Sequence, residues 1–184
     1  FLRSWLVAWI FWSGFALGAL AVLLLHHLVG GGWGLLALRV LEASVRTLPG
    51  MVLLFLPLAF GLPDLYAWAR PDAVAADPLL AHKTAYLNVP FFLSRAALYF
   101  AAWGGMAWMI CRWSSRQDES EDPVFRRRLQ ALSGPGLVAY ALTITFASVD
   151  WAMSLEPHWY SSIYAPLVMV GQALSALAFA IVVL

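Results

Sequence analysis

The chain has 184 residues, of which 62% are hydrophobic and 11% are charged, and its formal net charge is +1. A soluble domain is roughly half apolar and about a quarter charged, so this chain has too few polar groups to cover its own surface in water. The small net charge excludes the basic field of a nucleic-acid-binding protein. The single cysteine, Cys111, excludes an intrachain disulfide and a thiolate iron–sulphur or zinc site.

A spanning helix needs about 20 mostly apolar residues. Five stretches meet this requirement, so we predict an all-α fold, a single polytopic transmembrane helix bundle. The predicted spans cover residues 5–28, 35–61, 90–111, 135–155 and 161–184. The first and the last apolar runs extend to the two ends of the chain, so we expect the chain to be a fragment of a larger bundle.

Two longer polar segments connect these spans. Residues 62–89 combine prolines with aromatic side chains, which is typical of an interfacial loop with short helical pieces. Residues 113–133 contain the run Arg126-Arg127-Arg128, whereas the other segment has only Arg70 and Lys83 as Lys or Arg. Basic loops remain in the cytoplasm. We therefore expect residues 113–133 to be a cytoplasmic loop and residues 62–89 to be a periplasmic one.

Ionisable groups at membrane depth are costly and are functional candidates by default. In the second span, Arg39, Glu42 and Arg46 lie on one helix face and can pair with one another. A structural ion-pair network is the simpler interpretation, and a proton path that enters from the cytoplasm through Glu42 is the alternative. His26, at the cytoplasmic end of the first span, is a further candidate. It cannot share a haem iron with the adjacent His27, because neighbouring residues point in different directions around a helix.

The fourth span carries a polar stripe in which Thr143, Asp150 and Ser154 share one face, with Ser148 nearby. Such a stripe must face protein or water. Asp150 lies about 22 Å along the helix from the start of this span, toward the periplasmic side. We take it as the first candidate for a functional acid that relays protons or holds a quinone carbonyl. An Asp that caps a neighbouring helix or pairs with an arginine is the alternative.

Directly after this span, Glu156 and His158 place a carboxylate and an imidazole at the membrane interface, beside Trp159. A quinone head group binds where an acid or a histidine can exchange the hydroquinone proton. These two residues are therefore candidates for a proton exit or a quinone pocket, and an aromatic belt beside a turn is the alternative.

Several stretches resemble one family of membrane subunits. The longest is the run Phe-Ala-Ser-Val-Asp-Trp-Ala-Met-Ser-Leu-Glu-Pro-His-Trp at residues 146–159, and shorter ones lie at residues 26–34, 39–43, 87–92 and 129–136. They are similar to ActF, the NrfD-like integral membrane subunit of alternative complex III, a bacterial quinol:electron-acceptor oxidoreductase. The resemblance implies two helix bundles in the inner (cytoplasmic) membrane, of which this chain would supply about the first.

The resemblance also implies the partners and the division of chemistry among them. The implied partners are a sister NrfD-like quinol-binding subunit, an iron–sulphur-type subunit, c-type cytochrome subunits, small membrane anchors, lipid and a terminal oxidase supercomplex. Haem and iron–sulphur clusters would lie on partner subunits, and a quinone is the one small molecule this chain could contact. We expect a redox-inert accessory subunit of respiratory or photosynthetic electron transport that contributes to proton translocation or quinone-pocket structure. A purely structural membrane anchor is the alternative.

Overall fold

The computed structural model describes residues 1–119 and 122–184, and these residues form helices and no strand. The predicted all-α fold class is therefore confirmed. In chain order the helices are α1 (Leu2–Val29), α2 (Leu38–Val45), α3 (Leu48–Phe60), α4 (Leu62–Leu65), α5 (Pro71–Ala76), α6 (Pro78–Lys83), α7 (Val89–Glu119), α8 (Pro123–Trp151) and α9 (Tyr164–Val183), with two 3-10 turns, η1 (Ala67–Ala69) and η2 (Met153–Leu155).

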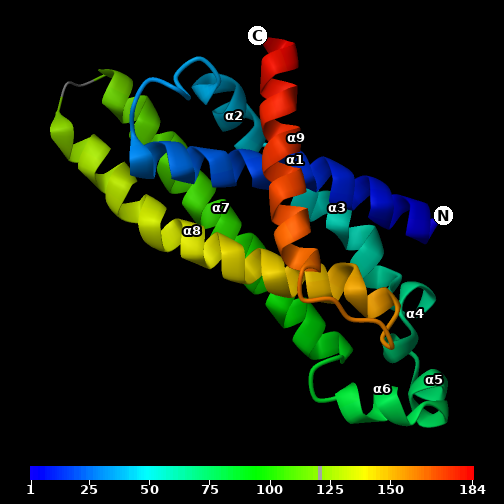
Figure 1. The fold of residues 1–184 in the computed structure, drawn as a ribbon. Helices are drawn as coiled ribbons and strands as arrows, with labels where there is room; N and C mark the ends of the chain where they lie inside the picture. Colours follow the sequence, from blue (N-terminus) through cyan, green and yellow to red (C-terminus); the bar gives the residue numbers. More distant parts are fainter. Residues whose placement is uncertain (120–121) are drawn as a thin grey trace.

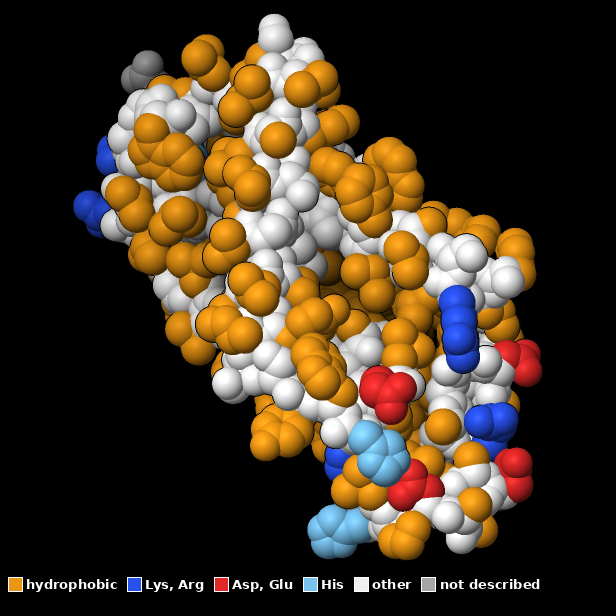
Figure 2. All heavy atoms as spheres, turned by 45° about the vertical axis from the view of Figure 1, so that its right-hand side comes forward, with side chains coloured by type: hydrophobic (Ala, Val, Ile, Leu, Met, Phe, Trp, Pro, Cys, Tyr) orange, Lys and Arg blue, Asp and Glu red, His pale blue; other side chains and the backbone are white. Residues whose placement is uncertain are grey.

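Four helical segments of the described chain are long and apolar enough to cross a membrane. They are Leu2–Val29, Leu38–Phe60, Pro123–Leu155 and Tyr164–Val183. Hydrophobic side chains cover most of the face seen in Figure 2, whereas the charged and histidine side chains gather toward its ends. This distribution suits a helix bundle surrounded by lipid, and the chain is a helical membrane protein.

Helix α1 is the centre of the bundle, since it packs against α2, α3, α8 and α9 (Figure 1). The closest approach is to α9, where a Cβ added at Gly18 would lie 1.9 Å from the backbone oxygen of Gln172. Small residues allow helices to approach this closely in a membrane. The glycines after α1 end it as predicted, because Gly30 has a φ of 73°, which favours glycine.

The second predicted span, residues 35–61, is divided into α2 and α3 by a break at Arg46 and Thr47. Pro49 explains the break: it has no backbone N–H to donate to the carbonyl of Val45, one turn earlier. The backbone tightens at this point, and the Thr47 N–H donates to the carbonyl of Ser44 at 3.1 Å. The two helices still follow one another as a single apolar segment.

Helix α7 contains the third predicted span, residues 90–111, and continues to Glu119. Its 31 residues are enough to cross a bilayer, although it is not among the four most apolar segments. Asn88 caps its start by accepting a hydrogen bond from the Phe91 N–H at 2.9 Å. The helix lies beside α8 (Figure 1).

The structure corrects the loop predicted at residues 113–133. Helix α7 occupies its first part and α8 begins at Pro123, twelve residues before Pro135, where the fourth span was predicted to start. The sequence carried the signal for this earlier start: the Asp122 carboxylate accepts from the Val124 N–H at 2.9 Å, and a proline follows at the first helical position. Arginine, leucine and glutamine then favour a helix that extends beyond the membrane.

The segment at residues 62–89 folds into the short helices α4 to α6, and prolines lie in the first turn of each. It is tied to the end of α8. The Tyr66 hydroxyl donates to the Trp151 carbonyl at 2.9 Å, and Lys83 Nζ donates to the Pro157 carbonyl at 2.6 Å. We call this the α4–α6 end of the bundle, and the opposite end, where α2 meets the last turns of α7, the α2 end (Figure 1).

Candidate functional site

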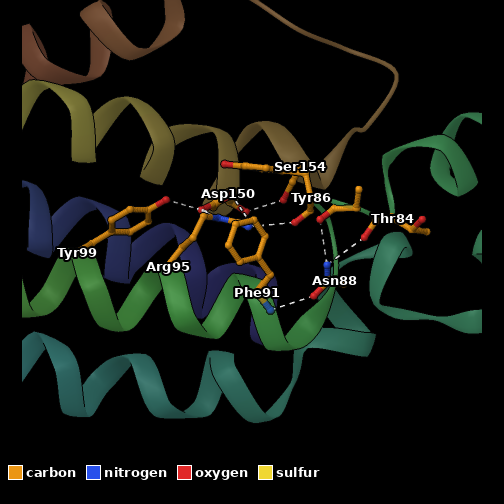
Figure 3. Close-up of polar contacts among 9 residues, drawn as sticks. Thr84, Tyr86, Asn88, Phe91, Arg95, Tyr99, Asp150 and Ser154 are labelled. Atoms are coloured by element: carbon orange, nitrogen blue, oxygen red, sulfur yellow. Dashed lines mark hydrogen bonds and ion pairs between the residues drawn. The ribbon is translucent and has the colours of Figure 1, made fainter.

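The strongest polar site is an ion pair between Asp150, in the last turn of α8, and Arg95, in the second turn of α7 (Figure 3). Arg95 Nε donates to Asp150 Oδ2 and Nη2 donates to Oδ1, both at 2.8 Å. Asp150 is fully buried, and Arg95 is 7% exposed. This parallel pair of charge-assisted bonds is the strongest contact that an arginine makes with a carboxylate.

Tyr99 lies one turn after Arg95 on the same face of α7. Its hydroxyl donates to Asp150 Oδ2 at 2.8 Å, so the carboxylate accepts three hydrogen bonds. The remaining guanidinium nitrogen, Arg95 Nη1, donates to the Tyr86 carbonyl at 3.0 Å. We call these four residues, Tyr86, Arg95, Tyr99 and Asp150, the Asp150 cluster. In the described chain, both charges of the cluster are neutralised and hydrogen-bonded.

Aromatic rings hold the guanidinium in place. The Arg95 Cζ atom lies 3.8 Å from the centroid of the Tyr86 ring and 4.3 Å from that of the Phe91 ring, which are cation–π distances. The Tyr86 hydroxyl is itself buried, and its burial, together with the nearby Asp150 charge, raises its pKa to about 12. The Tyr86 side chain is therefore neutral throughout the physiological range.

A wall of aromatic side chains closes the inner side of the cluster. The Trp151 ring, next to Asp150, packs 4.8 Å from Trp9 and 5.8 Å from Phe100 between ring centroids. Ser154, in η2, donates to the backbone carbonyl of Asp150 at 2.5 Å and fixes the end of α8. The Asp150 carboxylate is 0% exposed in these surroundings, so charge interactions here are much stronger than in solvent.

Arg95 and Tyr99 are the functional candidates that sequence reasoning missed. The signal was present, because Arg95 is an arginine inside the third predicted span, and Tyr99 and Trp103 follow at intervals of four residues. Helical geometry places all three on one face of α7. The arginine-paired interpretation of Asp150, which the sequence left open, is the arrangement that the structure has.

The other members of the predicted polar stripe do not reach the Asp150 carboxylate. Thr143 accepts a hydrogen bond from Trp103 Nε1 at 2.8 Å and donates to the carbonyl of Ala139. Ser148 is buried and donates to the Ile144 carbonyl at 2.7 Å. Both hydroxyls are therefore engaged with the backbone of their own helix, as is common for serine and threonine in membrane helices.

At the interface of the α4–α6 end, His158 Nε2 lies 2.7 Å from Asp77 Oδ2. This contact lowers the pKa of Asp77, with the hydrogen bond to His158 as the main cause. Glu156 is exposed, and its side chain forms no hydrogen bond with the described residues. These two predicted exit groups thus lie near the surface, separate from the buried cluster.

The charged residues of the second predicted span form a different arrangement at the α2 end. Arg39 Nη1 donates to Glu42 Oε2 at 2.7 Å, and Arg39 also pairs with Asp118 at the end of α7. Arg46 forms no ion pair with any carboxylate in the described part of the chain. The predicted network of Arg39, Glu42 and Arg46 is therefore different in the structure: Arg39 pairs with Glu42 and Asp118, and Arg46 is not part of it.

His26 is 6% exposed and lies under the glycine-rich turn after α1. Its ring is 5.3 Å from that of Trp33, and a Cβ added at Gly34 would lie 2.6 Å from His26 Nδ1. With His27, Asp118 and other residues it lines a pocket of about 280 Å³. His26 is thus placed at the same end as Glu42, far from the Asp150 cluster.

An apolar layer separates the two ends. Along α7, Tyr99 and Cys111 are twelve residues apart, which is about 18 Å of helix. The Trp103–Thr143 contact lies in the first part of this interval, and the buried side chains beyond it are Met106, Ala107 and Ile110. Along α7 the described side chains therefore provide polar groups at each end, whereas on α8 and α9 the Tyr140 hydroxyl donates to Gln172 Oε1 at 2.7 Å between them.

No family model matches the chain, and no curated protein matches it. Within the described residues, no three or more His, Cys, Asp or Glu side chains gather as a metal site.

Proposed function

We propose that this chain is a redox-inert membrane subunit of a bacterial quinol-oxidising complex of the alternative complex III type, and that the Asp150 cluster is a proton gate. The buried, bidentate Arg95–Asp150 pair is the observation that carries this proposal. Asp150 lies within the run at residues 146–159, the longest of those that resemble ActF. The proposed location is the cytoplasmic membrane, with the α4–α6 end toward the periplasm.

The chemistry of the gate follows from the hydrogen bonds. The Arg95 guanidinium faces the Asp150 carboxylate through two parallel hydrogen bonds in an apolar environment, so the two charges compensate one another. When a proton reaches Asp150, the carboxyl becomes neutral and its attraction to Arg95 is lost. In the proposed step the Tyr99 hydroxyl, 2.8 Å from Oδ2, passes its proton to that oxygen and takes one in return from a hydronium ion or water molecule that reaches the tyrosine oxygen.

Arg95 has a second set of contacts in which it can remain when the pair opens. The Tyr86 carbonyl accepts from Nη1, and the Tyr86 and Phe91 rings flank the guanidinium. A shift toward these groups would bring the charge closer to the surface of the α4–α6 end. The proton leaving Asp150 would then reach Glu156 or His158, the interface groups that sequence reasoning assigned to an exit.

The geometry favours proton conduction over a quinone contact at Asp150. The carboxylate is 0% exposed and presents no surface to a head group. A quinone on this chain would instead have to meet the exposed Glu156 and His158. Glu42, with His26 nearby, is the proposed uptake region, and protons would cross the apolar layer between the two ends through water or through a neighbouring subunit.

The test is the proton-to-electron ratio during quinol oxidation by the intact complex in sealed vesicles. We expect Asp150→Asn to keep electron flow while the ratio falls. Asp64→Asn, which neutralises an exposed acid at the same end, is the matched control and keeps the wild-type ratio. If Asp150→Asn prevents assembly, Tyr99→Phe retains the ion pair and removes only the proton-passing hydroxyl.

A structural anchor is the second candidate, and one observation favours it. All three hydrogen bonds accepted by the Asp150 carboxylate come from α7, so the cluster also joins α7 to α8. If that is its whole role, neutralising Asp150 will weaken folding or change nothing, but the ratio of protons to electrons will stay the same in every variant that assembles. Retention of the ratio in both Asp150→Asn and Tyr99→Phe would reject the gate.

A further inference from the structure

A surface groove lies between α7 and the segment where α2 meets α3, and it is distinct from the Asp150 cluster. Its volume is about 360 Å³, which is within the range of ligand pockets, roughly 300–1,000 Å³. The lining is mostly apolar and includes Leu48, Pro49 and Ala107. A Cβ built at Gly104, which also lines it, would meet no atom within 4 Å. We call this the α3–α7 groove.

Two arginines, Arg46 and Arg112, line the same groove. Both are exposed, and neither forms an ion pair with a carboxylate in the described chain. Glu42, the acid expected to pair with Arg46, is bonded to Arg39. Arg112 lies over the ring of Trp108, at 5.2 Å from its centroid. The groove therefore joins an apolar surface to two cationic groups that have no anionic partner among the described residues.

We propose that the α3–α7 groove binds one anionic phospholipid, with its phosphate at Arg46 and Arg112 and an acyl chain along Leu48 and Gly104. Guanidinium groups bind phosphate through parallel hydrogen bonds, which makes an arginine pair suited to this head group. Trp108 is 61% exposed at the same site, as aromatic anchors at the membrane interface are.

The positive charge of the groove and its position in the bundle favour a lipid over a quinone or a protein helix as its occupant. The groove is at the α2 end, where the run of three arginines in α8 also lies, so the positive-inside rule places it on the cytoplasmic side. Basic pockets between membrane helices on this side bind anionic head groups. A quinone head group is neutral and gains little from two cations. A second protein helix would need to bring its own acid to this position.

The experiment measures lipid retention by the purified protein in its native assembly. The assembly is exchanged into detergent with equal amounts of phosphatidylglycerol and phosphatidylcholine, and native mass spectrometry counts the lipids retained. We expect wild type to keep one phosphatidylglycerol in preference to phosphatidylcholine. The double variant Arg46→Gln/Arg112→Gln should reduce this preference about tenfold or more, since each arginine loses a charge-assisted hydrogen bond.

Two further variants separate a seated lipid from general attraction. Gly104→Leu fills the groove from an open position and keeps both arginines, so we expect it to lose the retained phosphatidylglycerol. Arg127→Gln/Arg128→Gln removes the same charge from an exposed part of α8 outside the groove, and we expect it to retain the lipid as wild type does.

Several outcomes would overturn the proposal. Equal retention of the two lipids by wild type would remove the anionic selectivity. An equal loss in both double variants would reduce the effect to net charge. Unchanged retention in Gly104→Leu would show that no lipid is seated in the groove. Displacement of the lipid by a short-chain quinone, with no effect of the arginine substitutions, would assign the groove to a quinone.

Discussion

The two ends of the bundle hold their buried polar groups in different ways. At the α4–α6 end, the Asp150 carboxylate and the Arg95 guanidinium meet several donors and acceptors in a fixed geometry. At the α2 end, Glu42 Oε1 and His26 Nδ1 are buried with no hydrogen-bond partner among the described residues, and the ion pair of Arg39 reaches the surface. The satisfied Arg95–Asp150 pair stabilises the contact between two helices, although the buried Tyr86 hydroxyl and Trp151 Nε1 beside it have no hydrogen-bond partner among the described residues. At the α2 end one oxygen of the acid itself is unsatisfied, which leaves capacity for water, protons or a ligand.

The largest expected effect is the loss of one partner at the satisfied end. Arg95→Met would leave Asp150 buried and unpaired, which costs about 3–5 kcal/mol in the free energy of unfolding. Unfolding in mixed micelles with increasing denaturing detergent measures this cost. The double variant Arg95→Met/Asp150→Leu should recover most of it, because no charge then remains buried. An Arg95→Met variant as stable as wild type would contradict the cluster as the main polar contact of α7 and α8.

A smaller effect is expected for Tyr99→Phe, which keeps the ion pair and removes one hydrogen bond to a charged group. Such bonds contribute about 1.5–3 kcal/mol. The same unfolding measurement on Tyr160→Phe is the control, because Tyr160 is 86% exposed. Equal stability of the two variants would show that the Tyr99 hydroxyl adds nothing to the cluster.

At the α2 end, Glu42→Gln should change the free energy of unfolding by less than about 1 kcal/mol. The Arg39 side chain is 53% exposed, so solvent screens its pair with Glu42, and a glutamine oxygen can still accept from it. The proton-to-electron ratio of the intact complex, by contrast, should fall if Glu42 takes up protons. A loss of stability as large as that of Arg95→Met would remove the difference between the two ends.

The smallest effect concerns the exposed Asp77–His158 pair. Its hydrogen bond lowers the pKa of Asp77 in the folded chain, so the pair adds stability above the unfolded value, about 3.9, and loses it as the pH falls through the lowered value. We expect the stability difference between wild type and Asp77→Asn to be present at neutral pH and to vanish in acid. A difference that does not change with pH would exclude this pair as its source.

The apolar runs and the glycines after α1 were sufficient to predict a helical membrane bundle. Helix ends were predicted less well where a helix leaves the membrane: hydropathy marks the apolar part of α7 and α8, whereas Asp122 and Pro123 set the true start of α8. The break before α3 could have been predicted from the sequence, because Pro49 has no backbone N–H to donate within a helix.

Asp150 was predicted as the leading polar candidate because an acid in an apolar helix must find a partner. Its partner, Arg95, is 55 residues away in the sequence. The pairing depends on how α7 lies against α8, which local sequence patterns do not specify. Helix packing also explains why the Arg39 network includes Asp118 of α7 and not the predicted Arg46. Periodicity places residues on a face of one helix, and packing decides which face of another helix they meet.

The most direct test of the proton gate is the protonation state of Asp150 while the intact complex oxidises quinol. Infrared difference spectra of the working complex should contain a band of a protonated carboxyl group that disappears in Asp150→Asn and remains in Asp64→Asn. The same band in Asp150→Asn as in wild type would mean that Asp150 stays ionised and paired with Arg95 throughout turnover, and the gate would be rejected.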